Sequence, residues 1–582
     1  MELKRTYFCG NIDKQNISDN IILNGWIKKI RDFGKILFID LWDHEGICQL
    51  VFDLNNKNLK EIKNCIVGDC IGVKGKVIER KEKNDDLKTG AVEVRVEKFE
   101  QFSMSKPLPI DRSKDLSEDV RLKYRYLDLR TNKMQQILRI RYKYLMAVRE
   151  FLDNEKFIEV ETPILSKSTP EGARDYVVPS RMKPGNFYAL PQSPQLYKQL
   201  LMIGGFDKYY QIARCFRDED FRANRQAEFT QIDIEMAFVK ENDILDLTER
   251  LIKYSFEKII DKKINIPFKR MEYNEAINKY GIDKPDLRFG LKIKDITQDI
   301  DVSGFKVLEG AKESGKKIKA IKLDNKDVSR KEIDNYTEYV KNFGAKGLIW
   351  FIKSDNQLRS SILKFLKDGG KSIESAMNMK NGDTVFIVAD DNKIASKALG
   401  RLRIKLRDDF DLIKNKDELN FIWITHFPMF EYSEEEERYK ANHHPFSMPY
   451  REDMLNYKNS APEKIRSYGY DIVLNGEEIA GGSIRNHLEN LQEEVFDILN
   501  IDKSEQKDKF GFFLEALKYG TPPHGGIAFG LERIIQILTN NESIRDVIAF
   551  PKTTNASCLM SKSPSKINKK QLDELRIKLK KD

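Results

Sequence analysis

The chain has 582 residues, of which 40% are apolar and 33% charged, and its formal net charge is +9. A chain of this length divides into several domains, and this composition is typical of a folded globular protein. No apolar run is long enough to cross a bilayer and the first residues hold no apolar signal core, so we expect a cytoplasmic protein. The six cysteines form no CxxC pair, which argues against a disulfide framework or a zinc cluster.

Residues 1–105 predict a small all-β domain. Its candidate strands, separated by glycine-containing turns, are 21–30, 35–41, 46–53, 69–78 and 91–102. This number of short strands is typical of an OB-fold barrel, which binds single-stranded nucleic acid. Trp26, Phe33 and Phe38 lie close in sequence to a basic run over 28–31, the mixture that base stacking beside phosphate requires. The alternative is that Trp26 and Phe38 belong to the barrel core.

Residues 106–130 predict a hinge, because prolines interrupt its first part before a helix that we expect over 117–130. An amphipathic helix follows over 133–154, and then a short strand that ends before Pro163, which cannot donate to a sheet ladder. We expect the first part of a second domain to cover 131–270.

Residues 208–238 predict a β-hairpin with a long charged loop. In both arms, large apolar residues alternate with other residues at a period of two, as they do in strands. The joining segment 217–228 holds Arg217, Arg222 and Arg225 together with four acids. Arginine presents a planar fork that matches phosphate or carboxylate oxygens in pairs, so this loop suits a polyanion with a bound cation. The alternative is a solvated charged loop.

A lysine-rich α/β segment over 271–417 follows, and we expect an insertion domain with its own core. Its candidate strands are 320–323, 347–352 and 384–389. Within it, residues 310–317 have the outline of a phosphate-binding P-loop. A lysine stands where that motif needs a serine or threonine for magnesium, so we reject the motif.

The second domain resumes over 418–555. A buried strand is expected over 421–424, and a strand–turn–strand unit over 470–485. A glycine-rich strand runs into a helix over 522–537, where free N–H groups can meet a nucleotide. Residues 556–582 predict a basic tail that is helical over its last 20 residues.

Several of these segments resemble a known family. The order FRDE…EFTQ over 216–231 resembles motif 2 of the class II aminoacyl-tRNA synthetases, and 133–163 and 522–537 resemble their motifs 1 and 3. With TPEGARDY over 169–176 and FYALPQSPQLYKQLLM over 187–202, the chain is similar to the bacterial-type aspartyl-tRNA synthetases of subclass IIb. The resemblance implies an α+β multidomain fold: an OB-fold anticodon-binding barrel, an antiparallel-sheet catalytic domain flanked by helices, and an α/β insertion domain.

The resemblance also implies a reaction, in which ATP as substrate and Mg²⁺ activate L-aspartate as aspartyl-adenylate before transfer to tRNA-Asp. It implies a homodimer with no membrane or DNA partner. Three alternatives stay open: an enzyme that also charges tRNA-Asn, an asparaginyl or lysyl enzyme of the same fold, and a non-catalytic RNA-binding paralogue.

The site residues follow from the same resemblance. The residues given catalytic roles are Arg217, Glu219 and Arg533. Those expected around aspartate are Glu171, Ser193, Gln195, Lys198, Arg217, Asp233, His443, His444 and Arg485. Those expected around ATP are Arg217, Asp218, Glu219, Gln226, Phe229, Glu478, Gly530, Leu531, Glu532 and Arg533. The expected Mg²⁺ ligands are Asp471 and Glu478, and the expected anticodon-reading residues are Phe38, Gln49 and Glu93.

These roles have a chemical rationale. The resemblance places Arg217 on the α-phosphate and adenine between Phe229 and Arg533. It places Lys198 and Arg485 on the side-chain carboxylate of aspartate. Two cations around one carboxylate favour aspartate over asparagine, whose neutral amide would present donors to donors. A lysine-specific pocket would instead need acids.

Overall fold

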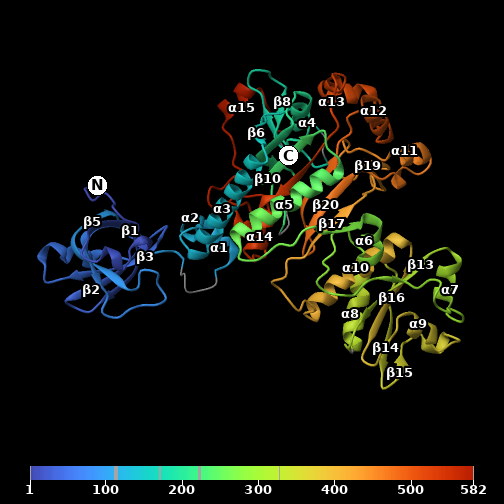
Figure 1. Cartoon of the computed structure of the whole chain (residues 1–582), viewed down its shortest axis with the longest axis horizontal. Coiled ribbons are helices and arrows are strands. Elements are labelled where there is room, and N and C mark those ends of the chain that lie inside the picture. Colours follow the sequence, from blue (N-terminus) through green and yellow to red (C-terminus); the bar gives the residue numbers. More distant parts are fainter. Residues whose placement is uncertain (1, 111–115, 170–171, 220–223, 327, 581–582) are drawn as a thin grey trace. The chain divides into compact units, whose positions relative to one another are not determined.

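The structure is a computed structural model that describes residues 2–110, 116–169, 172–219, 224–326 and 328–580. It divides into two compact units (Figure 1). The first comprises Met1–Leu138, Ala549–Thr553 and Ser557–Ser565. The second comprises Arg139–Ile548, Thr554–Ala556 and Lys566–Asp582. Among the described residues, no helix combines the length and the apolar character that a membrane span requires.

The first unit contains a closed barrel with strand order β1-β2-β3-β5-β4. Its strands are β1 (Asn20–Asp32), β2 (Ile36–Asp43), β3 (Gly46–Asp53), β4 (Cys70–Glu79) and β5 (Val92–Ser103). Short 3-10 turns accompany them at η1 (Cys9–Asn11), η2 (Lys14–Asn16) and η3 (Lys57–Asn64). All five predicted strands and the OB-fold class are thereby confirmed.

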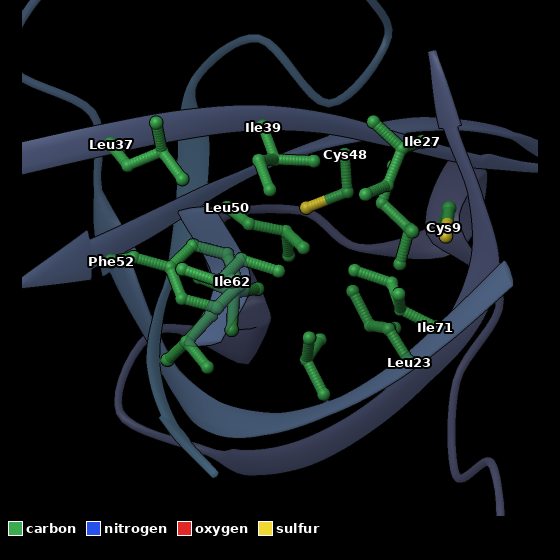
Figure 2. Packing of buried hydrophobic residues seen from close by; sticks show 14 of the residues in the cluster. Cys9, Leu23, Ile27, Leu37, Ile39, Cys48, Leu50, Phe52, Ile62 and Ile71 are labelled. Carbon is green, nitrogen blue, oxygen red and sulfur yellow. The ribbon is translucent and has the colours of Figure 1, made fainter. Parts of the chain in front are cut away.

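Alternate side chains of the barrel strands point inward and form one apolar core (Figure 2). Leu37, Ile39, Leu50 and Phe52 are examples from two neighbouring strands. Trp26 and Phe38 are only half-buried and lie outside this cluster. The alternative that places both in the barrel core is therefore wrong.

Helices follow the barrel at α1 (Glu118–Lys123), α2 (Arg125–Asp128) and α3 (Asn132–Asn154). The prediction of one continuous helix over 117–130 is wrong, because two short helices occupy this segment. Tyr124 has φ −108° and ψ 37°, outside the helical region, so the segment breaks there into α1 and α2. The long helix expected over 133–154 is confirmed as α3.

The second unit is built on an eight-stranded sheet with order β11-β17-β20-β21-β22-β10-β9-β6. All pairs are antiparallel except β11 with β17 and β6 with β9. The strands are β6 (Ile158–Glu159), β9 (Lys208–Phe216), β10 (Glu228–Ala237), β11 (Lys269–Glu272), β17 (Phe421–Thr425), β20 (Gly469–Leu474), β21 (Glu477–Ile484) and β22 (His524–Gly530). The predicted hairpin is confirmed as β9–β10, and it lies beside the glycine-rich strand β22.

Helices and smaller sheets surround this sheet (Figure 1). α5 lies against it, and Glu249 of α5 accepts a hydrogen bond from the indole of Trp423 in β17. The helices are α4 (Gln195–Ile203), α5 (Glu241–Ile259), α6 (Tyr273–Tyr280), α11 (Arg451–Tyr457), α12 (Glu489–Ile498), α13 (Lys503–Leu517), α14 (Leu531–Leu538) and α15 (Lys569–Leu575). The 3-10 turns are η5 (Pro462–Lys464) and η6 (Ile544–Val547), and the small sheets pair β7 (Val177–Pro179) with β8 (Phe187–Ala189) and β18 (Phe430–Ser433) with β19 (Arg438–Ala441).

The lysine-rich segment forms a separate five-stranded sheet with order β12-β13-β16-β14-β15. Two apolar clusters pack against it, so the segment has its own core, as expected. Its strands are β12 (Lys294–Asp295), β13 (Lys317–Leu323), β14 (Ile349–Ser354), β15 (Gln357–Arg359) and β16 (Thr384–Asp390). Its helices are α7 (Lys306–Glu313), α8 (Arg330–Lys341), η4 (Leu363–Phe365), α9 (Lys371–Ala376) and α10 (Asn392–Asp409).

The structure also tests two predictions about single segments, the P-loop outline over 310–317 and the helical C-terminal tail. The rejected P-loop outline falls on helix α7 followed by strand β13, the reverse of the strand–loop–helix order that a P-loop needs. The prediction that the last 20 residues are helical is wrong in extent, because among the described residues of that segment only Lys569–Leu575 are helical. Ser557–Ser565 belongs to the first unit. The precise domain boundaries stay predictions.

Candidate functional site

A cavity of about 230 Å³ opens where the β9–β10 hairpin, β21, β22 and α14 meet. Eight of the ten residues predicted around ATP line it: Arg217, Glu219, Gln226, Phe229, Glu478, Gly530, Glu532 and Arg533. Asp218 and Leu531 do not. The backbone N–H of Asp218 instead donates to the carbonyl of Arg174, and Leu531 is fully buried. The sequence prediction missed several lining residues, among them Asn224 and Gln231.

Two arginines of the cavity are placed to meet an anion. The Arg217 guanidinium lies 5.1 Å from the ring centroid of Phe229. Arg533 donates to the backbone carbonyl of Glu478. The Nε atoms of Arg217 and Arg533 are buried and have no hydrogen-bond partner among the described residues. Such atoms are costly to leave unpaired, so both arginines have donors to offer to phosphate oxygens.

The Glu532 carboxylate is held by the protein itself. One oxygen lies 2.8 Å from Arg141 of α3, and the other accepts from the backbone N–H of Thr230 at 3.0 Å. These bonds fix the start of α14 against β10. Glu532 therefore lines the cavity with a carboxylate whose two oxygens already accept from Arg141 and Thr230.

Beside the cavity lies a cluster of buried charges that we call the charge cluster: Lys198, Asp233, Glu235, Arg485 and His444. The Lys198 ammonium lies 2.6 Å from Asp233 Oδ1 and 3.1 Å from Glu235 Oε2. Arg485 donates twice to Glu235, at 2.8 and 3.0 Å. The charged members that were expected around aspartate are Lys198, Asp233 and Arg485, and the neutral His444 was expected there as well. Glu235 was not among the expected residues.

The charge cluster is balanced rather than positive. Burial would raise the pKa of Glu235, but Arg485 and Lys198 lower it to about 2, so this carboxylate is ionised. Burial raises the pKa of Asp233 above its ordinary value in spite of Lys198. Each of the two cations expected to bind the side-chain carboxylate of aspartate, Lys198 and Arg485, thus already pairs with a carboxylate of the chain.

Two buried atoms lack partners among the described residues: Asp233 Oδ2 in the charge cluster, and Nε2 of Gln195, which lies on α4 three residues before Lys198. One is an acceptor and the other a donor. An α-amino acid brings a donating ammonium and an accepting carboxylate, so the two orphan atoms complement it. Of the other residues expected around aspartate, Ser193 lines a smaller neighbouring cavity, and Glu171 lies outside the described residues.

The adjacent histidines serve different groups. His444 Nε2 lies 2.6 Å from Arg485, which can only donate, so the imidazole accepts. Burial and the neighbouring Arg485 lower the pKa of His444 well below its ordinary value, which keeps it neutral. His443 Nε2 instead lies 3.5 Å from Asp471 Oδ1. His444 therefore contacts the charge cluster, whereas His443 contacts Asp471, one of the carboxylates expected to bind metal.

Asp471 and Glu478 come from the neighbouring strands β20 and β21. A Cβ on Gly481 would lie 2.5 Å from Asp471 Oδ1 and 3.8 Å from Glu478 Oε1, so both carboxylates face the space above this glycine. Burial, with Glu478 beside it, raises the pKa of Asp471 to about 6 against the effect of His443. No group of three metal-binding side chains occurs among the described residues. Two close carboxylates nevertheless suit Mg²⁺, which is commonly held by one or two carboxylates plus substrate phosphates.

On the barrel, two of the three expected anticodon-reading residues, Gln49 and Glu93, are buried and belong to one hydrogen-bonded network. Gln49 donates to Glu93 at 2.6 Å and accepts from Arg31 at 2.9 Å, and Arg31 also donates twice to Asp40. The half-buried Phe38 meets the exposed Phe33 edge to face, with ring centroids 5.8 Å apart. This face of the barrel therefore offers exposed rings beside ordered polar groups.

Comparison with known families decides what kind of protein this is. Residues 117–554 match the model of tRNA synthetases class II (D, K and N), and residues 21–102 match that of the OB-fold nucleic acid binding domain. The chain belongs to the class II tRNA synthetases. The resemblance found in the sequence is confirmed.

Relatives of this synthetase are close over the whole length. The aspartate–tRNA ligase of Clostridium tetani (strain Massachusetts / E88) is 50% identical, with 100% of this chain and 99% of the relative covered. That of Clostridium beijerinckii is 49% identical, with 99% and 97% covered.

Solved structures show the same fold. The asparaginyl-tRNA synthetase of Pyrococcus horikoshii, complexed with asparaginyl-adenylate, matches with a TM-score of 0.60 at 19% identity and covers 95% of the synthetase and 98% of its own chain. The aspartyl-tRNA synthetase of Entamoeba histolytica matches with a TM-score of 0.57 at 20% identity, with 94% and 91% covered.

Proposed function

We propose that the synthetase joins L-aspartate to tRNA-Asp in two steps, through an aspartyl-adenylate formed from ATP. The observation that carries the proposal is the charge cluster beside the nucleotide cavity, with an orphan acceptor on Asp233 and an orphan donor on Gln195. The full-length relatives named aspartate–tRNA ligase support it. Neither a lysyl enzyme nor a non-catalytic paralogue is favoured.

The balanced charge cluster can select aspartate by exchange of partners. The substrate ammonium would occupy Asp233 Oδ2 and weaken the hold of Asp233 on Lys198. The side-chain carboxylate of aspartate would then take up the Lys198 ammonium and the one N–H of Arg485 that is not engaged by Glu235, His444 or Ser483. Asparagine would present the N–H donors of its amide to these donors and leave hydrogen bonds unmade in a buried site, which is a large penalty.

The first step needs little covalent chemistry from the protein. The attacking carboxylate is already ionised, so the step requires two anions to be brought together and negative charge to be stabilised. Positioning alone can supply up to about 7–11 kcal/mol of a barrier. Arg217 and Arg533, which both line the cavity, supply fixed positive charge where the phosphate charge develops.

Asp471 and Glu478 are the residues that would hold Mg²⁺, because they fit a hard cation that also binds phosphate oxygens. When bound, the cation would neutralise charge on the ATP phosphates. The chain's own contribution is to keep the two carboxylates side by side across β20 and β21.

A homodimer is part of the proposal. β6 is the edge strand of the large sheet, and Ile158 on it is exposed, as are Ile164 and Leu165 just beyond it. Tyr142 and Met146 on α3 are exposed as well. Contiguous exposed apolar side chains at a sheet edge favour an interface, and two-fold dimers are the commonest oligomers. The proposed place of action is the cytoplasm, where tRNA is charged.

The test of the proposal is ATP–pyrophosphate exchange by the purified protein with aspartate, asparagine or lysine in turn. We expect exchange with aspartate alone, followed by charging of tRNA-Asp. Exchange with asparagine or lysine would assign another amino acid, and no exchange with any of them would favour the non-catalytic paralogue. Charging of a tRNA-Asn transcript with aspartate would identify the relaxed-specificity enzyme.

Phe38→Ala should impair tRNA charging and leave ATP–pyrophosphate exchange unchanged. Loss of one base-stacking ring costs about 1–3 kcal/mol, so kcat/KM for tRNA-Asp should fall by about one to two orders of magnitude. Phe8→Ala is a matched control, since Phe8 is a half-buried ring of the same unit that packs on His44. Equal charging by Phe38→Ala and the wild type would remove Phe38 from the tRNA-binding face.

A further inference from the structure

The insertion domain is joined to the large sheet by two connectors, and both contact the same turn. The outgoing connector is residues 281–290, and the return connector is 418–420. The turn is residues 475–476, between β20 and β21. It precedes Glu478 by two residues and follows Asp471 by four, so it lies between the two proposed metal ligands in the chain.

The return connector is tied to the turn by hydrogen bonds. Asn475 Oδ1 accepts from the backbone N–H of Asn420 at 2.9 Å, and Asn475 Nδ2 donates to the carbonyl of Glu418 at 2.8 Å. The backbone N–H of Asn475 also donates to the carbonyl of Asn420. Asn475 has φ 55°, a left-handed conformation that asparagine tolerates better than most residues.

The outgoing connector packs on the other residue of the turn. A Cβ on Gly476 would lie 3.0 Å from Asp286 Cβ and 3.5 Å from its backbone nitrogen. Gly476 also has φ 87°, so this close approach and this conformation both require glycine. The turn is thus held between the two chain segments that enter and leave the insertion domain.

Arg403 of helix α10 fixes the outgoing connector. Its side chain is fully buried, and it donates to the backbone carbonyls of Asp286, Phe289 and Gly290 at 2.5, 3.3 and 3.3 Å. Its guanidinium also lies 3.9 Å from the ring centroid of Phe289 and 4.9 Å from that of Tyr280. Charged hydrogen bonds to three carbonyls hold a backbone segment firmly.

Further contacts make this junction stiff. A Cβ on Gly400 of α10 would lie 2.8 Å from backbone atoms of Gly281, so helix and connector are in direct backbone contact. The Asp286 carboxylate accepts from the backbone and the guanidinium of Arg288. Movement of α10 therefore passes to the connector rather than being absorbed by it.

We propose that Arg403 is a positioning residue for the metal site: through residues 281–290 and the turn 475–476 it sets the spacing of the Asp471 and Glu478 carboxylates. The proposal rests on the proposed function, since it assigns the insertion domain a role in the same reaction. The partner recognised is a divalent cation bound with ATP phosphates. Arg403 touches neither, so its effect is confined to how well the two carboxylates hold the cation.

The test compares Arg403→Met with the wild type in the full chain. Mn²⁺ replaces Mg²⁺ as the probe, and its binding is followed by electron paramagnetic resonance in the presence of a non-hydrolysable ATP analogue. We expect Mn²⁺ affinity to fall about tenfold, the lower end of the range for residues that orient metal ligands. The Mg²⁺ concentration for half-maximal exchange should rise in parallel, with the KM for aspartate unchanged.

Arg401→Met is the matched control, because Arg401 is an exposed arginine of the same helix that packs on Phe343 instead. It should bind Mn²⁺ as the wild type does. Asn475→Gly is the second variant. It loosens the turn and leaves the buried Arg403 side chain in place. Glycine keeps the left-handed conformation and the backbone bond to Asn420 but removes the two side-chain bonds, to Asn420 and Glu418, so Mn²⁺ affinity should again fall.

The outcomes separate two failures. Wild-type Mn²⁺ affinity in Asn475→Gly and in a folded Arg403→Met overturns the proposal. If thermal unfolding shows that Arg403→Met does not fold, the Mn²⁺ affinity of Asn475→Gly alone tests the proposal, and a wild-type value overturns it. A wild type that binds Mn²⁺ with the analogue but does not exchange pyrophosphate with aspartate overturns the proposed function instead.

Discussion

Arg485→Leu should abolish aspartate-dependent ATP–pyrophosphate exchange while ATP binding persists. Arg485 is fully buried, and it bridges Glu235 and His444 at the centre of the charge cluster. Removing one partner of a buried charge pair costs about 2–5 kcal/mol or more, and here the substrate carboxylate loses a binding partner as well. We therefore expect kcat/KM for aspartate to fall by a factor of about 10³ or more.

Exchange kinetics and ATP binding by calorimetry check this expectation. Arg466→Leu is the matched control, since Arg466 also pairs with a carboxylate, that of Asp453, but lines neither cavity nor charge cluster. The control should retain exchange. Wild-type exchange by Arg485→Leu would exclude Arg485 from aspartate recognition.

Arg217→Ala should lower kcat for exchange by about 10²–10³, the usual cost of losing one charge-stabilising donor. Arg217 lines the nucleotide cavity, its Nε has no partner among the described residues, and its guanidinium lies over Phe229. The loss should appear in kcat more than in the KM for ATP, because the charge on the phosphate grows in the transition state.

Arg214→Ala provides the comparison for this variant. Arg214 lies on β9, three residues before Arg217, but it donates to Thr230 and Glu228 and does not line the cavity. Steady-state exchange at saturating ATP should distinguish the two. Equal kcat values for Arg217→Ala and the wild type would refute the role given to Arg217.

The strands could be predicted because their signals are local. Alternation with period two and glycine-containing turns mark the barrel strands and the β9–β10 hairpin in the sequence itself. The strands that were missed have two to four residues each: β7, β8, β11, β12, β15, β18 and β19. Runs this short carry no period, and their pairing is set by the tertiary structure. The break at Tyr124 likewise has no local breaker such as proline.

The nucleotide cavity could be predicted because it is built from the motifs, whereas the balance of the charge cluster could not. Alternation placed Asp233 and Glu235 on one face of the hairpin. Lys198 is 35 residues away from its partner Asp233, and Arg485 is 250 residues away from its partner Glu235. No period relates such positions. The adjacent histidines show the same limit, because neighbours in sequence serve different groups in space.

The hydrogen-bonded network on the barrel has a thermodynamic consequence. Gln49 is held by Arg31 and Glu93 before any nucleotide arrives. Much of the rotational freedom of these side chains is therefore already lost in the unliganded barrel, and docking need not freeze it. In the proposed anticodon-reading role, a base with the wrong edge would have to break bonds among Arg31, Gln49 and Glu93 without replacing them, so this rigidity would improve discrimination between anticodons more than affinity.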